Sequence, residues 1–140
     1  MTALVLGAAA TWAMVGLIWF VQLVHYPLLA RFSAATPGAV AVEHQRRTGW
    51  VVGPPMAVEG VTALWLLFDR PDTMSATGAW AGAVLLAVAL GSTVMVQVPL
   101  HRRLAAGHDD ATARRLVSGN WVRTVAWTAR GVLLAGVLLT

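Results

Sequence analysis

The stretch that decides the fold is residues 2–24, which read TALVLGAAATWAMVGLIWFVQLV. It carries no charged side chain, and it is long enough to cross the hydrocarbon core of a bilayer, which takes about 20 apolar residues in an α-helix. A secretory signal peptide would begin with basic residues and have an apolar region of only about 7 to 15 residues. We therefore expect residues 2–24 to form a retained transmembrane helix.

Three more apolar runs follow, at about 50–68, 79–100 and 120–139. Of the 140 residues, 58% are hydrophobic and only 11% are charged, and the mean hydropathy is +0.69. A water-soluble domain of this size keeps too much of its surface in water to hide so many apolar side chains. The sequence therefore predicts an all-α bundle of four transmembrane helices, with residues 1–140 forming a single integral membrane domain.

All ten basic residues are arginines, and their positions indicate the orientation of the bundle. The connections 25–49 and 101–119 hold seven of them, whereas 69–78 holds only Arg70. Basic residues favour the cytoplasmic side, so we expect both long connections in the cytoplasm and both termini outside a bacterial cytoplasmic membrane. Arginines beside apolar runs are typical of contact with anionic lipid head groups, so the expected partner is the lipid bilayer and not nucleic acid. The seven are Arg31, Arg46, Arg47, Arg102, Arg103, Arg114 and Arg115.

Both long connections show patterns typical of short amphipathic helices at the membrane surface, one over residues 37–47 and one from Asp109 or Asp110 through Ala113 to Val117. The alternative is a solvated linker, because helix propensity is a weak guide over so few residues. The candidate helix starts are Thr36 followed by Pro37, and Asp109 or Asp110.

The second apolar run contains Gly53, Pro54 and Pro55 near its start. Proline removes a backbone donor and clashes with the preceding turn. We therefore expect a helix that begins or breaks at this point.

The chain also resembles a duplicated helical hairpin. Val21-Gln22 followed by His25 matches Val96-Gln97 followed by His101, and the residues 48–51 (TGWV) match 118–122 (SGNWV). Repeats in membrane proteins often place a binding site at the interface between their halves.

Two ionisable residues, Glu59 and Arg130, lie deep inside apolar runs. Each costs roughly 2.5 to 3.5 kcal/mol at the centre of a membrane helix, so neither is expected to face lipid. Counting about 1.5 Å per residue, both lie at a similar depth. An ion pair across the bundle is one interpretation, and a polar pocket that meets a substrate group or a proton is the other.

Polar residues also form one stripe on each run, clearest at Asn120, Arg123, Trp127 and Arg130, whose spacing places them on one helix face. We expect these stripes to enclose a polar cavity in the cytoplasmic half of the bundle. The alternative is that the tryptophans form interfacial belts and that Arg123 extends to the membrane surface. The expected rim is Gln22, His25, Gln97, His101, Asn120 and Arg123, the floor is Glu59 and Arg130, and the walls are Trp19, Trp121 and Trp127.

Histidine is a common proton carrier and metal ligand, so His25 and His101 are candidates for both roles, with Glu59, Glu43 and His44 as further candidate ligands. The absence of cysteine excludes disulfides, thiolate ligands and covalently attached c-type haem. A mononuclear metal site needs three or four converging ligands, and no H-x-x-x-H or E-x-x-H spacing is present. Haem or metal ligation stays open, and the cofactor is unknown.

Residues 97–124 carry a family resemblance. Val98-Pro99-Leu100-His101 and Asn120-Trp121-Val122-Arg123-Thr124, together with Pro27 after the first run, resemble the anthrone oxygenase-like family of small four-helix membrane proteins. In that family the third helix ends in Asn-x-Pro-Leu-Asn and the fourth begins with Asn-x-x-Arg-Thr. The resemblance implies a four-helix membrane fold and the oxidation of a polycyclic phenol by dioxygen, with Asn120 and Arg123 in the pocket.

We therefore expect a membrane oxidoreductase that binds a flat aromatic or quinone-type molecule, with the tryptophans stacking on its ring. The alternatives are a lipid or quinone binder without catalysis, a transport-associated protein, and a histidine-ligated haem or metal protein. A homo-oligomer is compatible with the sequence. The candidate catalytic residues are His25, His101, Glu59 and Arg123, and the candidate substrate-binding residues are Gln22, Gln97, Asn120, Trp121, Trp127, Arg130 and Trp19.

Overall fold

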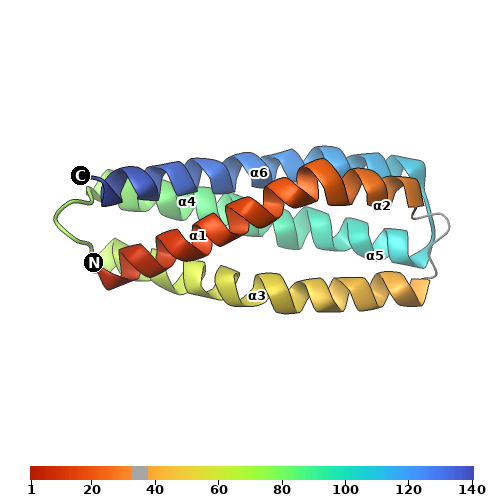
Figure 1. Cartoon of the computed structure of the whole chain (residues 1–140), viewed down its shortest axis with the longest axis horizontal. Helices are drawn as coiled ribbons and strands as arrows, with labels where there is room; N and C mark the ends of the chain where they lie inside the picture. The colour runs from red at the N-terminus through yellow and green to blue at the C-terminus, as the bar shows by residue number, and fades with distance from the viewer. Residues whose placement is uncertain (33–37) are drawn as a thin grey trace.

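The computed structural model of the chain describes residues 1–32 and 38–140, which are helical throughout apart from short connections. Figure 1 shows the helices as a single elongated bundle. The elements are α1 (Thr2–Phe20), a first π-helical segment (Val21–His25), α2 (Tyr26–Phe32), α3 (Gly38–Phe68), α4 (Ala76–Ser92), a second π-helical segment (Thr93–Gln97), α5 (Val98–Ala106) and α6 (Asp110–Leu138).

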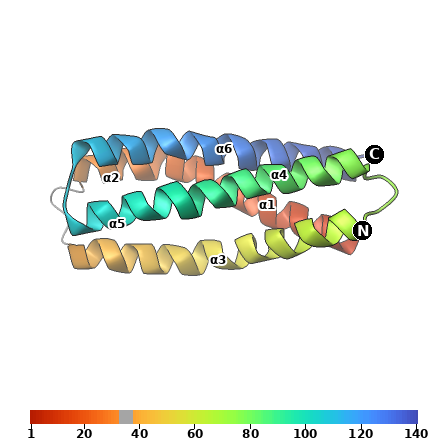
Figure 2. The ribbon, with the colours of Figure 1, turned by 180° about the vertical axis from the view of Figure 1, so that it is seen from behind.

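The elements combine into four long rods, because each π-helical segment joins its two neighbouring α-helices without a break. The α1–α2 rod and the α4–α5 rod lie on opposite sides of the bundle, and each contacts both α3 and α6. Both termini lie at one end (Figures 1 and 2), which we call the terminal end. The opposite end holds α2, α5 and the starts of α3 and α6, and therefore all seven clustered arginines. We call it the arginine end.

The α1–α2 rod is inclined across the bundle. It contacts α3 mainly through α1, whereas α2 contacts α6 at the arginine end. Figure 1 shows α2 and α3 far apart there. The space between α2 and α3 at the arginine end, which we call the wedge, is lined by residues of both helices and of α5. Figure 2 shows α5 there on the side nearest the viewer.

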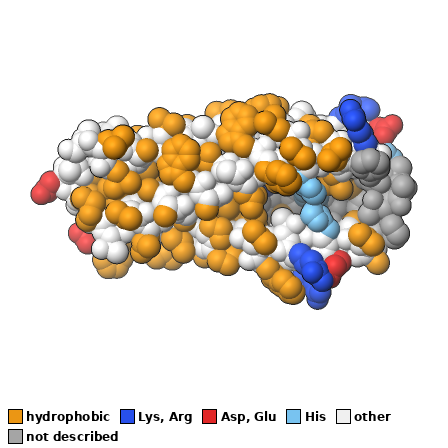
Figure 3. Space-filling model, in the orientation of Figure 1, with side chains coloured by type: hydrophobic (Ala, Val, Ile, Leu, Met, Phe, Trp, Pro, Cys, Tyr) orange, Lys and Arg blue, Asp and Glu red, His pale blue; other side chains and the backbone are white. Residues whose placement is uncertain are grey.

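Three rods in the described part of the chain are long and apolar enough to cross a membrane: residues Thr2–Arg31, Gly38–Phe68 and Ala76–Ala106. Large hydrophobic side chains cover much of the exterior (Figure 3). These features indicate a helical membrane protein. The rod α6 is not among the three, because its polar first turns and its two buried arginines, Arg123 and Arg130, lower its hydropathy.

The short amphipathic helices expected in the connections are not separate elements. Residues 40–47 are the first turns of α3, and 113–117 are the first turns of α6. The predicted start of α6 is confirmed: the Asp109 carboxylate accepts hydrogen bonds from the backbone N–H of Ala111 at 3.3 Å and of Thr112 at 2.9 Å. The expected start at Thr36 and Pro37 lies outside the described residues.

The expected break at Gly53, Pro54 and Pro55 is wrong, because α3 continues through all three residues. Each proline removes only one backbone donor, and its fixed φ of about −65° is already helical. The hydrogen bonds of the turns on either side keep the helix on its path.

The contact between α1 and α3 depends on Gly7. A Cβ atom at this position would lie 2.8 Å from Oγ1 of Thr62, and that hydroxyl is held in place because it donates to the Val58 carbonyl at 2.7 Å. We predict that Gly7→Ala lowers the free energy of unfolding by about 1 to 3 kcal/mol, the usual cost of overpacking. Reversible unfolding in detergent micelles measures this change.

Gly16 provides the matched control, since it lies on the same helix and a Cβ atom there would meet no neighbour. Gly16→Ala should leave stability unchanged or raise it by up to about 1 kcal/mol, because alanine favours the helix over glycine. Equal losses from both substitutions would show that close packing at Gly7 is not the cause.

Candidate functional site

The interior contains two groups of buried polar side chains, and the deeper one is centred on Glu59. In this Glu59 cluster, Thr11 donates its hydroxyl hydrogen to Glu59 Oε1 at 2.6 Å, and Trp127 Nε1 donates to Oε2 at 3.0 Å. Arg130 Nε donates to Thr11 Oγ1 at 3.1 Å and lies 3.7 Å from Glu59 Oε1. Its Nη1 donates to the Gly82 carbonyl of α4.

The Glu59 cluster is closed to solvent and is shared by all four rods. Thr11, Glu59, Trp127 and Arg130 are each exposed by 1% or less. The ion pair, one of the two sequence-based interpretations, is confirmed. Because both carboxylate oxygens already accept hydrogen bonds, Glu59 and Arg130 act as an interhelical tie and do not form the floor of a cavity.

The second group, the Arg123 cluster, lies nearer the arginine end. Arg123 Nε donates to Asn120 Oδ1 at 2.9 Å, its Nη1 to Thr93 Oγ1 at 3.2 Å and its Nη2 to the Tyr26 hydroxyl at 3.1 Å. Asn120 Nδ2 in turn donates to Gln22 Oε1 at 2.8 Å. Within the described residues, no carboxylate lies within ion-pair distance of Arg123, which is only 8% exposed.

The two π-helical segments supply partners to the Arg123 cluster from opposite sides. The first contains Gln22 and the second contains Thr93. Single π-helical turns inside α-helices are frequent at functional sites. Here they follow α1 and α4, and they contain Gln22 and Gln97, the two glutamines that the duplicated-hairpin pattern aligns.

Tyr26 is a site residue that the sequence analysis missed. It is the only tyrosine in the chain, it is 4% exposed, and its hydroxyl contacts both Arg123 and His101. The signal for it was its position four residues after Gln22, since residues four apart share a helix face.

A cavity of about 220 Å³, the histidine pocket, opens in the wedge between α2 and α3. Histidine side chains reach the surface on this face (Figure 3). The rings of His25 and His44 stack with their centroids 4.8 Å apart. His101 forms part of the α5 wall, and its Nε2 lies 2.8 Å from the Tyr26 hydroxyl. The lining residues are His25, Leu29, Val40, Ala41, His44, Gln45, His101, Leu104 and Ala105.

The hydrogen bonds around Tyr26 fix the direction of its hydroxyl. Arg123 can only donate, so the Tyr26 oxygen accepts from Arg123 Nη2. The tyrosine hydrogen is then free to be donated to His101 Nε2. In that arrangement the Tyr26 hydroxyl both accepts and donates one hydrogen bond, and the neutral His101 ring carries its own hydrogen on Nδ1.

The prediction that three tryptophans form the walls of a cavity is wrong for Trp19 and Trp121. Trp19 and Trp121 are 37% and 43% exposed on the exterior, where their rings pack edge to face at 5.7 Å. Trp19 Nε1 donates to the Thr128 hydroxyl at 3.1 Å. Trp127 is buried, but it belongs to the Glu59 cluster.

Gln97, the expected counterpart of Gln22, is 1% exposed. Its amide has no hydrogen-bond partner among the described residues. Gly119 lies close to it, since a Cβ atom there would be 3.1 Å from Gln97 Nε2. Gln97 is therefore near the Arg123 cluster without bonding to it.

The described residues contain no group of three or more His, Asp or Glu side chains placed to hold a metal ion. Glu43, a candidate ligand, is instead paired with Arg46 and Arg47, each at 2.7 Å. The histidine pocket therefore offers imidazole groups for hydrogen bonding and proton transfer.

Searches of protein-family models, curated proteins and solved structures each gave no match to this chain. The geometry of the two clusters and of the pocket therefore carries the functional proposal.

Proposed function

We propose that the protein binds the ring of a phenol or quinone-type molecule in the histidine pocket. The observation that carries the proposal is the chain of contacts from Arg123 to Tyr26 to His101, which connects a buried cation to the wall of an open pocket. Leu29, Val40 and Leu104 provide apolar walls for a ring, and the imidazoles provide partners for its oxygen.

The size of the pocket limits the ligand. Sites for drug-sized molecules span about 300 to 1,000 Å³, and this pocket measures about 220 Å³. A single ring or a pair of fused rings fits this space, and a lipid tail on that ring would extend into the bilayer. This makes a lipid-soluble quinol a better candidate than a three-ring anthrone.

The proposed chemistry is proton exchange with the ligand oxygen. With Nε2 bonded to Tyr26, His101 has Nδ1 left to meet a ligand. When His101 gives its Nδ1 hydrogen to a ligand oxygen, Nε2 can take the Tyr26 hydrogen, and Arg123 stabilises the resulting phenolate. The reverse path takes one proton from a quinol, whose second proton and two electrons pass to dioxygen, the oxidant that the family resemblance implies. The hydroperoxide anion formed takes up the stored proton and leaves as hydrogen peroxide, which returns the site to its starting state.

His101→Gln tests this function, because glutamine can still bond to Tyr26 but cannot carry a proton. With a water-soluble quinol analogue, we predict oxygen uptake by the purified protein and a loss of about 100-fold or more in the variant, within the range for general acid–base catalysis. His108→Gln is the matched control, since His108 lies in the connection before α6. Oxygen uptake that survives His101→Gln would reject the catalytic role.

A second candidate is a binder without catalysis, which the largely apolar lining of the pocket favours. It predicts that the quinol analogue raises the melting temperature without oxygen uptake. Loss of this stabilisation in His101→Gln would then assign the pocket as a binding site alone.

We also infer that α6 spans the membrane with the other three rods and that the arginine end is cytoplasmic, with both termini outside a bacterial cytoplasmic membrane. The burial of Arg123 and Arg130 inside the bundle and the positions of the seven clustered arginines support this orientation.

The chain has no cysteine, so single introduced cysteines report the orientation cleanly. A membrane-impermeant maleimide applied to intact cells should label Asp72→Cys and should spare Arg115→Cys until the cells are lysed. The opposite pattern would reverse the orientation.

A further inference from the structure

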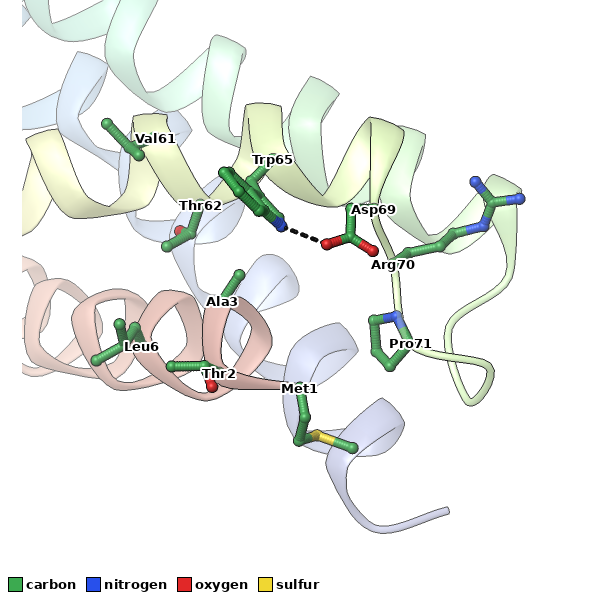
Figure 4. Close-up of a pocket in the computed structure, with 10 residues that line it drawn as sticks. All are labelled: Met1, Thr2, Ala3, Leu6, Val61, Thr62, Trp65, Asp69, Arg70 and Pro71. Carbon is green, nitrogen blue, oxygen red and sulfur yellow. Dashed lines mark hydrogen bonds between the residues drawn. The ribbon is translucent and has the colours of Figure 1, made fainter.

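A larger cavity, of about 460 Å³, lies at the terminal end between the start of α1 and the end of α3 (Figure 4). We call it the Trp65 pocket. It is far from the histidine pocket, which lies at the opposite end of the rods.

The Trp65 pocket is polar at one end and apolar at the other. Asp69 and Arg70 lie where α3 ends, and Leu6 and Val61 line the part nearer the middle of the bundle (Figure 4). Leu6 and Val61 are 52% and 66% exposed. Trp65 lies between the two parts and donates its Nε1 hydrogen to Asp69 Oδ2 at 3.0 Å.

Neither Asp69 nor Arg70 forms an ion pair within 4.0 Å in the part of the chain that the structure describes. Figure 4 shows the Asp69 carboxylate beside the Trp65 ring, with the Arg70 side chain extending outward from the rim. The end of α3 adds the partial negative charge of a helix C-terminus beside Asp69.

We propose that the Trp65 pocket binds a phospholipid whose head group carries an ammonium group. A carboxylate beside an aromatic ring is suited to an ammonium ion, and a guanidinium group at the rim is suited to a phosphate. The exposed Leu6 and Val61 side chains would contact an acyl chain. Tryptophan is also enriched at the depth of lipid head groups, where a rod end such as this one lies.

The test compares two lipids that differ only in the head group. Protein purified in detergent is mixed with equal amounts of phosphatidylethanolamine and phosphatidylglycerol with identical acyl chains, and bound lipid is counted by native mass spectrometry. We expect a preference of about tenfold for phosphatidylethanolamine. Equal retention of the two lipids would overturn the proposal.

Two variants assign the contacts. Asp69→Asn should abolish the preference, because the ammonium loses its carboxylate, and Arg70→Gln should weaken the retention of both lipids, because each has a phosphate. Asp72→Asn is the matched control, a carboxylate of the same connection that does not line the pocket. A similar loss of preference in Asp72→Asn would mean that the charge of the whole connection is responsible, and would also overturn the proposal.

Discussion

Replacing Arg130 with methionine is expected to lower the free energy of unfolding by about 3 to 5 kcal/mol, because removal of one partner strands the other charge in the interior. Glu59 is fully buried, and both of its remaining partners are neutral: Thr11 and Trp127. The substitution also removes the bond to the Gly82 carbonyl. Unfolding in detergent micelles measures the loss.

The double variant Glu59→Gln with Arg130→Met separates charge from packing. It leaves no charge at the site, and the glutamine amide can still bond to Thr11 and Trp127, so most of the lost stability should return. Arg115→Met, at an exposed position on the same helix, should change stability by less than about 0.5 kcal/mol. A double variant as unstable as Arg130→Met would show that the buried charge is not the cause.

In contrast to Arg130→Met, replacing Arg123 with methionine should have little effect on stability and a large effect on function. No carboxylate is stranded, and Tyr26 and Thr93 keep other acceptors in His101 and the Ala89 carbonyl. Only Asn120 Oδ1 loses its partners, at a cost of about 1 to 3 kcal/mol, and removal of an unpaired buried cation offsets part of this cost. We expect a net change below about 2 kcal/mol.

If the proposed function holds, Arg123→Met should reduce quinol-dependent oxygen uptake by about 100-fold, because Tyr26 loses the charge that stabilises its phenolate. Arg123 does not line the histidine pocket, so the affinity for the quinol analogue should stay nearly unchanged. Arg123→Lys should not restore turnover, since lysine lacks the fork that reaches Tyr26, Thr93 and Asn120 together. A parallel loss of affinity and turnover would instead indicate collapse of the pocket.

The sequence was sufficient to predict the helical class and the inward face of the fourth run. Asn120, Arg123, Trp127 and Arg130 are all buried. Polar side chains at helical spacing in an apolar run face the other helices, because the opposite face of the helix would place them in lipid. The approach of Glu59 to Arg130 followed from their equal depth. Each of these predictions required only the residue spacing within one helix or the depth of a residue in the membrane.

The features that the sequence could not predict are the pocket and the partners within each cluster. They depend on how the rods are placed and rotated relative to one another. The histidine pocket needs α3 to extend back to Gly38, which brings His44 beside His25, and the sequence pattern placed that segment in a separate helix. Thr11 and Tyr26 carry no charge and lie within apolar stretches of sequence, so no sequence pattern indicated their roles in the two clusters. The division of the polar residues into two clusters, with no single cavity, follows from the same placement.

The two π-helical segments have a consequence for the evolution of the molecule. A π-helical turn closes over five residues where an α-helical turn closes over four, so one inserted codon is enough to convert one into the other. The extra residue is absorbed within that turn, so the helix beyond it keeps its direction. Loss of a single codon within Val21–His25 would therefore restore a regular α-helical turn and leave α1 and α2 on their present paths, while removing one side chain from the turn that holds Gln22. A lineage can in this way change the partners supplied to the Arg123 cluster without rebuilding the rest of the bundle.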